Sequence, residues 1–393
     1  MGRERINAVT TSFFGKGSIG LLPAELKKRG YRRGLIVTDQ FLFEHKVAER
    51  VGQQILAAGA EYAIYYLVQP NPTVQVVNDC IEAAKALEVD FLAAVGGGSA
   101  IDTAKAVSIV IANGGKVEDY EGVDLSARAG LPIVAVNTTA GTGSEVTAFY
   151  IVTNTATHSK MCIMDTNCMV SIAVNDVDFM MSMPPGLTAS TGMDAMTHAI
   201  EAVLSVRATP FTDKDAMWAI RAIKDYLPAA VKDGQNVKAR EMMAYAEYTA
   251  GMAFSNAGLG MVHAMAHALG GHFNLPHGIC NSVLLPYAMK FNGGAPGASG
   301  RFQLVAEALE LPEARAMSDG RAAKECVKFI RGLSEELSMA RTLRELKGVD
   351  PKRFGDLADL ALKDFCMADN PLIPTREQVI RVYRDAYEGV LAV

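Results

Sequence analysis

Four of the seven histidines in this chain of 393 residues fall within one stretch of 15 residues: His263, His267, His272 and His277. His263 and His267 are four residues apart in an apolar segment with helical periodicity, so their imidazoles share one face of a helix. His277 lies between a proline and a glycine, in a turn that projects its side chain from another direction. Imidazole nitrogens that converge from separate elements are typical of a transition-metal site.

A second segment, LTASTGMDAMTHAIEA, adds a carboxylate to this set. Asp194 and His198 are also four residues apart, and the pattern predicts that both lie on one helix face. One Asp oxygen with imidazole nitrogens suits Fe²⁺ or Zn²⁺, whereas Mg²⁺ and Ca²⁺ prefer oxygen ligands. An HExxH metalloprotease site is excluded because residue 264 is Ala264. Spacing alone leaves open which histidines bind the metal, and we assign His45 and His158 no role.

Two glycine-rich segments compete as the phosphate-binding loop of a dinucleotide site. The first, GKGSIG at residues 15–20, has the GxGxxG form and precedes Asp39 by a spacing close to the dinucleotide-binding pattern. The second, Gly96 to Ser99, follows a clean strand (FLAAV) and precedes a long helix that carries Asp102. Backbone N–H groups at such a helix N-terminus bind a pyrophosphate. We therefore favour the second segment and interpret the first as a turn.

Two further features support a dinucleotide site. The segment NTTAGTGS at residues 137–144 follows another strand and offers hydroxyls and backbone donors that suit a ribose or a phosphate. Asp39, at the C-terminal end of an expected strand, suits the ribose hydroxyls. A carboxylate there would repel a 2′-phosphate, which favours NAD over NADP.

The elements that position these residues alternate in the first half of the chain. Short apolar runs predict strands, and segments with a period near 3.6 predict helices between them, which indicates an α/β domain with a mostly parallel sheet. After Pro184-Pro185-Gly186 the chain is rich in Ala, Leu and Met at helical spacing, which predicts an all-α domain. The expected strands are residues 34–39, 62–68, 91–95 and 133–138, and the expected helices are residues 41–58, 74–87, 100–112, 187–204, 210–225, 239–254 and 258–270.

Composition excludes several classes of protein. A net charge of −5 gives no basic surface for nucleic acid, and 50% hydrophobic residues are ample for a core. There is no apolar run of about 18 residues that would predict a membrane span, and the N-terminus has no secretory signal pattern. The six cysteines form no CxxC pair and suit free thiols in a reducing compartment. We therefore expect a cytoplasmic protein.

Five motifs resemble those of the iron-dependent (group III) alcohol dehydrogenase family. They are PNPT (70–73), GGGSAIDTAK (96–105), NTTAGTGSEVT (137–147), STGMDAMTHAIEA (190–202) and GLGMVHAMAHALGGHFNLPHG (258–278). The resemblance covers almost the entire chain, and the last motif is highly specific. Within the family, the layout is most similar to lactaldehyde reductases, 1,3-propanediol dehydrogenases and NAD-dependent methanol dehydrogenases.

The resemblance implies a fold of the dehydroquinate synthase-like type. An α/β NAD-binding domain would span residues 1–184, a helical metal-binding and catalytic domain would span 185–393, and the active site would lie in the cleft between them. NAD(H) is the implied cofactor and Fe²⁺ the implied metal, with Zn²⁺ as an alternative.

His267 matches a histidine near the nicotinamide that does not bind the metal, and we assign it the catalytic proton transfer. The residues that match the metal ligands are Asp194, His198, His263 and His277. Those that match cofactor contacts are Asp39, Asn71, Gly97, Gly98, Ser99, Asp102, Thr138, Thr139, Thr142 and Lys160.

The implied activity is hydride transfer between NAD(H) and a short-chain primary alcohol or its aldehyde. Reduction of an anionic aldehyde such as sulfoacetaldehyde and oxidation of a polyol such as glycerol are alternatives within the family. An NAD- and metal-dependent lyase of the dehydroquinate synthase type is a more remote alternative. We also expect a homodimer or larger homo-oligomer, a small-molecule substrate, and no nucleic-acid or membrane partner.

Overall fold

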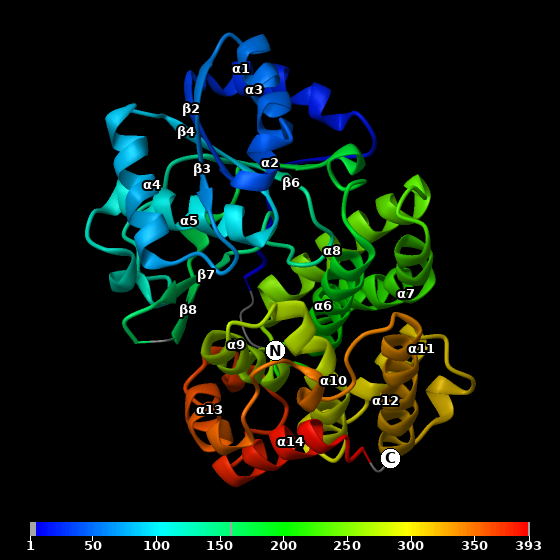
Figure 1. Cartoon of the computed structure of the whole chain (residues 1–393). Coiled ribbons are helices and arrows are strands. Elements are labelled where there is room, and N and C mark those ends of the chain that lie inside the picture. Colours follow the sequence, from blue (N-terminus) through cyan, green and yellow to red (C-terminus); the bar gives the residue numbers. More distant parts are fainter. Residues whose placement is uncertain (1–4, 158, 392–393) are drawn as a thin grey trace. The chain divides into compact units, whose positions relative to one another are not determined.

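The computed structural model of the chain describes residues 5–157 and 159–391. The chain forms two compact units, which meet in the sequence between Ser182 and Met183 (Figure 1). The first unit contains strands and helices, whereas the described residues of the second contain helices and no strand. No helix within the described ranges is both long and apolar enough to cross a membrane. The predicted fold class is therefore confirmed.

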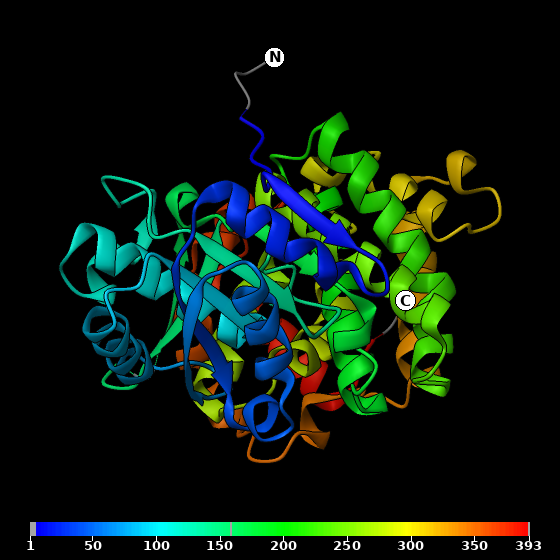
Figure 2. The same cartoon turned by 90° about the horizontal axis from the view of Figure 1, so that it is seen from above.

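The first unit is built on a six-stranded sheet in which every neighbouring pair of strands is parallel. The strand order is β1-β9-β6-β4-β2-β3, and β1 forms one edge, drawn as the blue arrow in Figure 2. The central strands β4 and β6 are buried along their whole length, which is why they are continuous apolar runs. The strands are β1 Thr11–Phe14, β2 Arg33–Asp39, β3 Glu61–Val68, β4 Phe91–Gly96, β6 Ile133–Asn137 and β9 Ile172–Asn175.

Helices cover both faces of this sheet (Figure 1). Apolar side chains of α1 (Leu22–Arg29) and α3 (Val47–Ala57) pack with every second residue of the strands in one buried cluster. The other face is covered by α4 (Val74–Ala86) and α5 (Gly98–Asn113). The prediction of one continuous helix over residues 41–58 is wrong, because the structure has two helices there. Lys46 has a left-handed φ of 59°, which separates a short α2 (Gln40–Glu44) from α3.

A second, three-stranded sheet was not foreseen from the sequence. It consists of β5 (Gly122–Val123), β8 (Ser159–Met164) and β7 (Phe149–Asn154), with β7 and β8 antiparallel. The buried Lys105 of α5 donates from Nζ to the backbone oxygens of Thr147 at 2.8 Å and Phe149 at 2.7 Å. The buried amino group of Lys105 thus fixes the start of β7 to the helix that follows the glycine loop.

In the second unit, the described residues form helices joined by turns and loops. Four of its helices begin with residues that favour a helix N-terminus. Pro185 is the first residue of α6. The side chains of Thr209, Asn236 and Thr375 cap α7, α8 and α14. Helix α7 continues beyond the predicted residue 225 to Lys232. The helices are α6 Pro185–Leu204, α7 Pro210–Lys232, α8 Val237–Ala257, α9 Met261–Phe273, α10 His277–Asn292, α11 Arg301–Ala308, α12 Asp319–Glu336, α13 Phe354–Ala361 and α14 Arg376–Glu388.

Candidate metal centre and dinucleotide site

The four residues predicted as metal ligands lie together in the helical unit. Asp194 and His198 project from α6, His263 from α9, and His277 is the first residue of α10. One potential ligand atom from each lies within 4.8 Å of those of the other three. Asp194, His198 and His263 are buried, whereas the His277 side chain is 26% exposed. Three helices therefore contribute to one cluster of donor atoms, in which His277 is the most exposed member.

Local packing explains why these helices approach so closely. A Cβ atom at Gly278 would lie 2.3 Å from the backbone oxygen of Ser190, so only glycine lets the start of α10 reach α6. The His198 ring is stacked between Phe254 and His263, with ring centroids 4.2 and 4.5 Å away. These contacts hold the imidazoles in fixed orientations, which a metal site requires.

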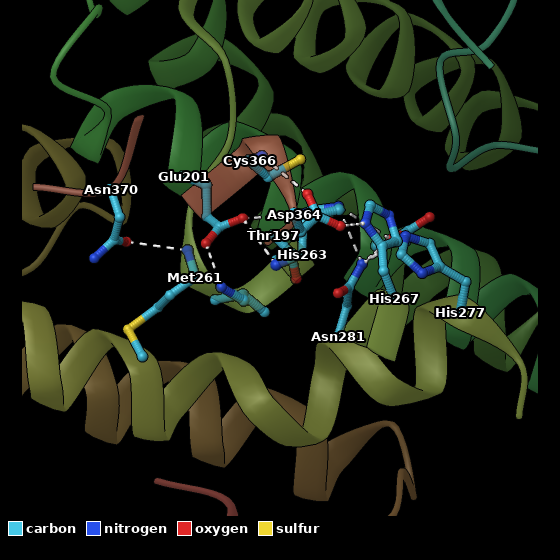
Figure 3. A network of polar contacts seen from close by, with 12 residues as sticks. Thr197, Glu201, Met261, His263, His267, His277, Asn281, Asp364, Cys366 and Asn370 are labelled. Atoms are coloured by element: carbon cyan, nitrogen blue, oxygen red, sulfur yellow. Dashed lines mark hydrogen bonds and ion pairs between the residues drawn. The ribbon is translucent and has the colours of Figure 1, made fainter. Parts of the chain in front are cut away.

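Asn281, which was missed in the sequence analysis, contacts three of these four residues, and Figure 3 shows it beside His263 and His277. Its Nδ2 atom lies 2.6 Å from Oδ1 of Asp194 and 3.1 Å from Nε2 of both His263 and His277. Three of the four donor atoms therefore face a common point. Because Asn281 follows His277 by four residues on α10, helical spacing was the signal that would have revealed it.

Glu201 is a second residue that was missed, and it contacts His263. Its Oε2 atom lies 2.6 Å from Nδ1 of that imidazole. Burial raises the pKa of Glu201 to about 7, against the opposing effect of hydrogen bonds from the N–H groups of Val262, His263 and Gly260. Asp194, His198 and Glu201 occupy positions 0, +4 and +7 of one helix, so periodicity alone places Glu201 on the ligand face.

His267, the predicted catalytic histidine, is buried beside the ligands and pairs with Asp364. Its Nδ1 atom lies 2.7 Å from Oδ2 of Asp364, and its ring is stacked on His277 with a centroid distance of 5.1 Å. Burial alone would raise the pKa of Asp364, but the charge and hydrogen bond of His267 and the N–H of Cys366 lower it. Nothing in the sequence near residue 267 pointed to Asp364.

The remaining histidines lie elsewhere. His272 is on α9, but it is not one of the four clustered residues, and its Nε2 accepts from Nε of Arg353 at 3.3 Å. Nδ1 of His45 lies 2.8 Å from the backbone oxygen of Phe41, at the end of α2. His158 lies outside the described residues. All six cysteines are free thiols.

The chemistry of the donor set fits a divalent transition metal. One carboxylate and three imidazoles are borderline ligands of the kind that Fe²⁺ and Zn²⁺ accept. Burial lowers the pKa of His263 well below its usual range, so its imidazole is neutral and keeps a lone pair for a metal. One negative charge against a divalent cation leaves the centre with a net positive charge.

In the first unit, the favoured glycine loop lies where the strand order reverses. The chain passes from β2 outward to β3 and then returns to β4 on the other side of β2, so the carboxyl ends of β2 and β4 flank the switch point. Ligands of open α/β sheets bind at such a point. Gly97 and Gly98 connect β4 to the N-terminus of α5 there.

This loop packs against the threonines of the third predicted segment. A Cβ atom would lie 2.8 Å from the side chain of Thr139 if added to Gly97, and 2.9 Å from that of Thr142 if added to Gly98. The N–H of Thr138, which is buried, donates to the backbone oxygen of Gly96 at 3.2 Å. Gly97, Gly98, Thr138, Thr139 and Thr142 are thus brought together, with Ser99 beginning the first turn of α5.

Asp39 and Asp102 also have structural partners. Oδ1 of Asp39 accepts from the N–H of Leu42 at 2.9 Å and caps α2. Asp102 accepts from Oγ of Ser144 and from the N–H of Ile151 at 3.0 Å, and burial raises the pKa of its carboxyl despite the nearby charge of Lys105. Both carboxylates therefore help to shape the loops of this unit.

Asn71 and Lys160 contact each other. Asn71, in the PNPT segment, has a left-handed φ of 57°, and its Oδ1 accepts from Nζ of Lys160 at 2.9 Å. The contact joins the loop after β3 to β8. These two residues are therefore positioned together, although they are 89 residues apart in the sequence.

The competing motif GKGSIG is engaged by a side chain of the protein itself. The buried carboxylate of Asp176 accepts from the N–H groups of Gly17 and Ile19, each at 3.0 Å. It also accepts from the N–H of Asp178 at 3.1 Å. The backbone donors that a phosphate would need are therefore bound to an internal anion, which agrees with the interpretation of this segment as a turn.

Comparison with known proteins defines the family. The profile "Iron-containing alcohol dehydrogenase" matches residues 10–177, and the profile "Fe-containing alcohol dehydrogenase family, C-terminal" matches residues 188–387. The chain belongs to the iron-containing alcohol dehydrogenase family.

Curated relatives are similar along nearly the whole chain. Alcohol dehydrogenase 4 of Schizosaccharomyces pombe is 43% identical over 375 residues, which cover 95% of this chain and 87% of the relative. NAD-dependent methanol dehydrogenase of Bacillus methanolicus is 39% identical, covering 95% of this chain and 97% of the relative. Lactaldehyde reductase of Escherichia coli is 38% identical, covering 96% of this chain and 98% of the relative.

Solved structures show the same fold. A 1,3-propanediol oxidoreductase matches with a TM-score of 0.93 and 38% identity, covering 98% of this chain and all of that one. A sulfoacetaldehyde reductase from Bifidobacterium kashiwanohense, solved in complex with NAD⁺, matches with a TM-score of 0.85 and 30% identity, covering 98% of this chain and 99% of that one.

These findings confirm several predictions from the sequence. The family is the predicted one, and the chain is an oxidoreductase that exchanges a hydride between NAD(H) and an alcohol or aldehyde. NAD(H) and iron are the cofactors of this family. The lyase alternative is disfavoured, because the relatives are dehydrogenases and a reductase.

Proposed function

We propose that this chain interconverts a short-chain primary alcohol and its aldehyde with NAD(H), at an iron centre held by Asp194, His198, His263 and His277. The observation that carries the proposal is the convergence of these four side chains, from three helices, within 4.8 Å of one another. The names of the similar methanol dehydrogenase and lactaldehyde reductase support a small, largely uncharged substrate.

The helical unit, residues 185–393 in our proposal, supplies the metal site. When bound there, a divalent iron supplies Lewis-acid polarisation of the substrate oxygen. The protein residues orient it: Asp194 contributes the single negative charge, and the stacked rings of His198 and His263 keep their nitrogens aimed at one point. Three of the four proposed ligands, Asp194, His198 and His263, are buried.

His267 is the proposed group for proton transfer. Asp364 accepts from Nδ1–H of this imidazole, so the lone pair is on Nε2. Nε2 takes the hydroxyl proton when an alcohol is oxidised and returns it when an aldehyde is reduced, while the hydride moves between the substrate carbon and the nicotinamide.

The α/β unit, residues 1–184 in our proposal, binds NAD(H). Gly97, Gly98 and Ser99 present the N-terminus of α5 to the pyrophosphate, and the neighbouring Thr138, Thr139 and Thr142 supply hydroxyls. Asp39 accepts hydrogen bonds from the adenosine ribose. Asn71, Asp102 and Lys160 complete the proposed contact set, and Lys160 is already oriented by Asn71.

A matched pair of variants tests the proposal. His263→Ala removes a ligand, whereas His272→Ala removes an imidazole from the same helix outside the cluster. We expect His263→Ala to lose bound metal and NADH oxidation together, and His272→Ala to keep both. Full activity of a wild-type protein that contains no metal would overturn the proposal.

The substrate is tested by a panel of short aldehydes and alcohols assayed through NADH absorbance with Fe²⁺ and with Zn²⁺. The panel includes lactaldehyde, formaldehyde, glycerol and sulfoacetaldehyde. We expect the highest kcat/KM for a neutral short-chain aldehyde. A strong preference for the sulfonate or for glycerol would select one of the two alternatives within the family.

The proposal also covers assembly and location. We propose a homodimer or larger homo-oligomer in the cytoplasm, and the six free thiols support a reducing compartment. Light scattering coupled to size-exclusion chromatography tests the assembly, and a monomer at micromolar concentration would contradict it.

A further inference from the structure

We propose that Glu201 is a positioning residue that selects the metal-binding tautomer of His263 and fixes its ring against α6. This inference rests on the proposed metal centre, because its subject is one of the proposed ligands. Glu201 is not among the four clustered ligand residues. Its contribution would be made entirely through His263 (Figure 3).

The tautomer of His263 is determined from both sides of its ring. Nδ1 lies 2.6 Å from Oε2 of Glu201; both oxygens of this carboxyl already accept from backbone N–H groups, and in the ionised form they can only accept. Nε2 lies 3.1 Å from Nδ2 of Asn281, and an amide nitrogen only donates. The proton therefore resides on Nδ1, and the lone pair of Nε2 faces Asp194 and His277. Only this tautomer presents a lone pair to the cluster.

The carboxylate of Glu201 is itself held rigidly. Oε1 accepts from the N–H of Val262 at 2.7 Å, and Oε2 accepts from the N–H of His263 at 3.3 Å. A Cβ atom on Gly260 would lie 2.8 Å from Oε1, so glycine at this position leaves the space that the carboxylate fills. Glu201 is 3% exposed. A carboxylate fixed in this way cannot follow the imidazole if the imidazole rotates.

The position of Glu201 also links two helices that carry ligands. It lies on α6, one turn after His198, and it binds the first turn of α9, which carries His263. The contact therefore sets the distance between the ligands of α6 and the ligand of α9. Partners of this kind typically change metal affinity by about 10–100-fold when they are removed.

Glu201 also caps the N-terminus of α9. A variant of Asn370 tests this structural role separately from the contact with His263. Oδ1 of Asn370 accepts from the N–H of Met261 at 3.1 Å, in the same helical turn. The side chain of Asn370 forms hydrogen bonds with Met261, Asn292 and Leu372, none of which is a proposed ligand. Asn370→Ala thus weakens the same cap without changing the partner of His263.

Glu201→Gln is the informative substitution. Glutamine has nearly the same shape but only one acceptor oxygen, whereas Glu201 accepts with both. If the amide nitrogen faces His263, Nδ1 must become the acceptor, and the proton moves to Nε2. If the oxygen faces His263, the N–H of Val262 loses its acceptor and faces a donor instead. The first arrangement reverses the tautomer of His263, and the second places two donors against each other in the first turn of α9, which carries His263.

The experiment measures the affinity of Co²⁺ and Zn²⁺ by competition with a chelator in the full-length wild type, Glu201→Gln and Asn370→Ala. We expect affinity to fall by about 10–100-fold in Glu201→Gln and to stay near the wild-type value in Asn370→Ala. Nitrogen-15 NMR of histidine side chains in the metal-free wild type should show His263 protonated at Nδ1, whether or not the variants fold.

The outcomes separate this inference from the proposed function. If the wild type binds Co²⁺ and Glu201→Gln binds it as tightly, the metal centre stands and the role of Glu201 is wrong. An equal loss in Asn370→Ala would reduce Glu201 to a helix cap, and a proton on Nε2 of His263 in the wild type would also overturn the inference. If the wild type binds no divalent metal, the proposed metal centre itself is wrong.

Discussion

Oδ2 of Asp364 lies 2.7 Å from Nδ1 of His267, although the two residues are 97 positions apart in the sequence. Four residues earlier on the same helix, Nδ1 of His263 meets Oε2 of Glu201 at 2.6 Å. Both buried imidazoles of α9 are therefore held at Nδ1 by a carboxylate from another element. The same arrangement serves two proposed tasks: metal binding by His263 and proton transfer by His267.

Asp364→Asn should lower the stability of the helical unit in a pH-dependent manner. The folded chain lowers the pKa of Asp364, so its stabilising effect is present above its unfolded pKa of about 4 and is lost as pH falls through the lower folded value. Urea unfolding followed by Trp218, the only tryptophan, measures this. The difference from the wild type should be largest near neutral pH and shrink below about pH 4. A difference independent of pH would contradict the assignment.

His267→Ala should retain bound metal and change the pH dependence of kcat/KM. Removing a group for proton transfer typically costs about 10²–10⁴-fold in rate. Metal content by atomic absorption and a pH–rate profile in the same preparation check the prediction. Loss of metal would instead identify His267 as a ligand.

Asp39→Asn should relax the preference for NAD over NADP. Asparagine retains the acceptor for the N–H of Leu42, so α2 stays capped while the negative charge is removed. We expect the ratio of kcat/KM for NADPH to that for NADH to rise by roughly tenfold. Asp39→Ala is the companion variant, since it also removes the cap at a cost of about 1 kcal/mol. An unchanged ratio in Asp39→Asn would show that Asp39 does not face the ribose.

Gly98→Ala should weaken NADH binding and leave metal content unchanged. The added methyl group would meet Thr142 at 2.9 Å and displace the proposed pyrophosphate loop. Fluorescence titration of NADH should show a loss of affinity on the order of tenfold, equivalent to about 1.4 kcal/mol. Gly20→Ala, in the other glycine motif, has no heavy atom within 4 Å of the new Cβ and serves as the control. If Gly20→Ala weakens NADH binding and Gly98→Ala does not, the cofactor site is at GKGSIG.

Lys105→Met should destabilise the α/β unit by about 2–6 kcal/mol, because it leaves two buried backbone oxygens without their donor, at about 1–3 kcal/mol each. The backbone oxygens of Thr147 and Phe149 would lose the hydrogen bonds from Nζ of Lys105. Hydrogen exchange in β7 and α5 measures the loss. Lys85→Met removes an exposed lysine paired with Glu82 and should cost at most about 1 kcal/mol. An equal loss of stability in Lys105→Met and Lys85→Met would contradict this structural role of Lys105.

The sequence predicted those elements whose burial is encoded locally. The apolar runs of β2, β4 and β6 are covered on both faces, so they stand out without knowledge of their partners. The antiparallel pair β7 and β8 was missed because its identity as a sheet depends on pairing, such as Tyr150 with Ile163, that no periodicity records. The break at Lys46 was missed because a left-handed residue inside an amphipathic pattern leaves the pattern intact.

The candidate site divides in the same way. Helical spacing placed Asp194 with His198 and would also have placed Glu201 and Asn281, since each is three or four residues from a proposed ligand on the same helix. Asp364 could not be foreseen, because only tertiary folding brings it to His267. The grouping of three helices around one point likewise depends on close packing at Gly278, which the sequence records only as one glycine among 35.

The carboxylate of Asp176 in the GKGSIG loop bears on how such motifs are interpreted in general. A glycine pattern indicates that backbone N–H groups converge. It does not indicate whether the anion that they bind is a ligand or a side chain of the protein. In this chain the anion is the side chain of Asp176, which directly follows the end of β9. A motif of this form in another sequence therefore identifies a nucleotide site only when no acidic side chain of the same protein reaches the loop.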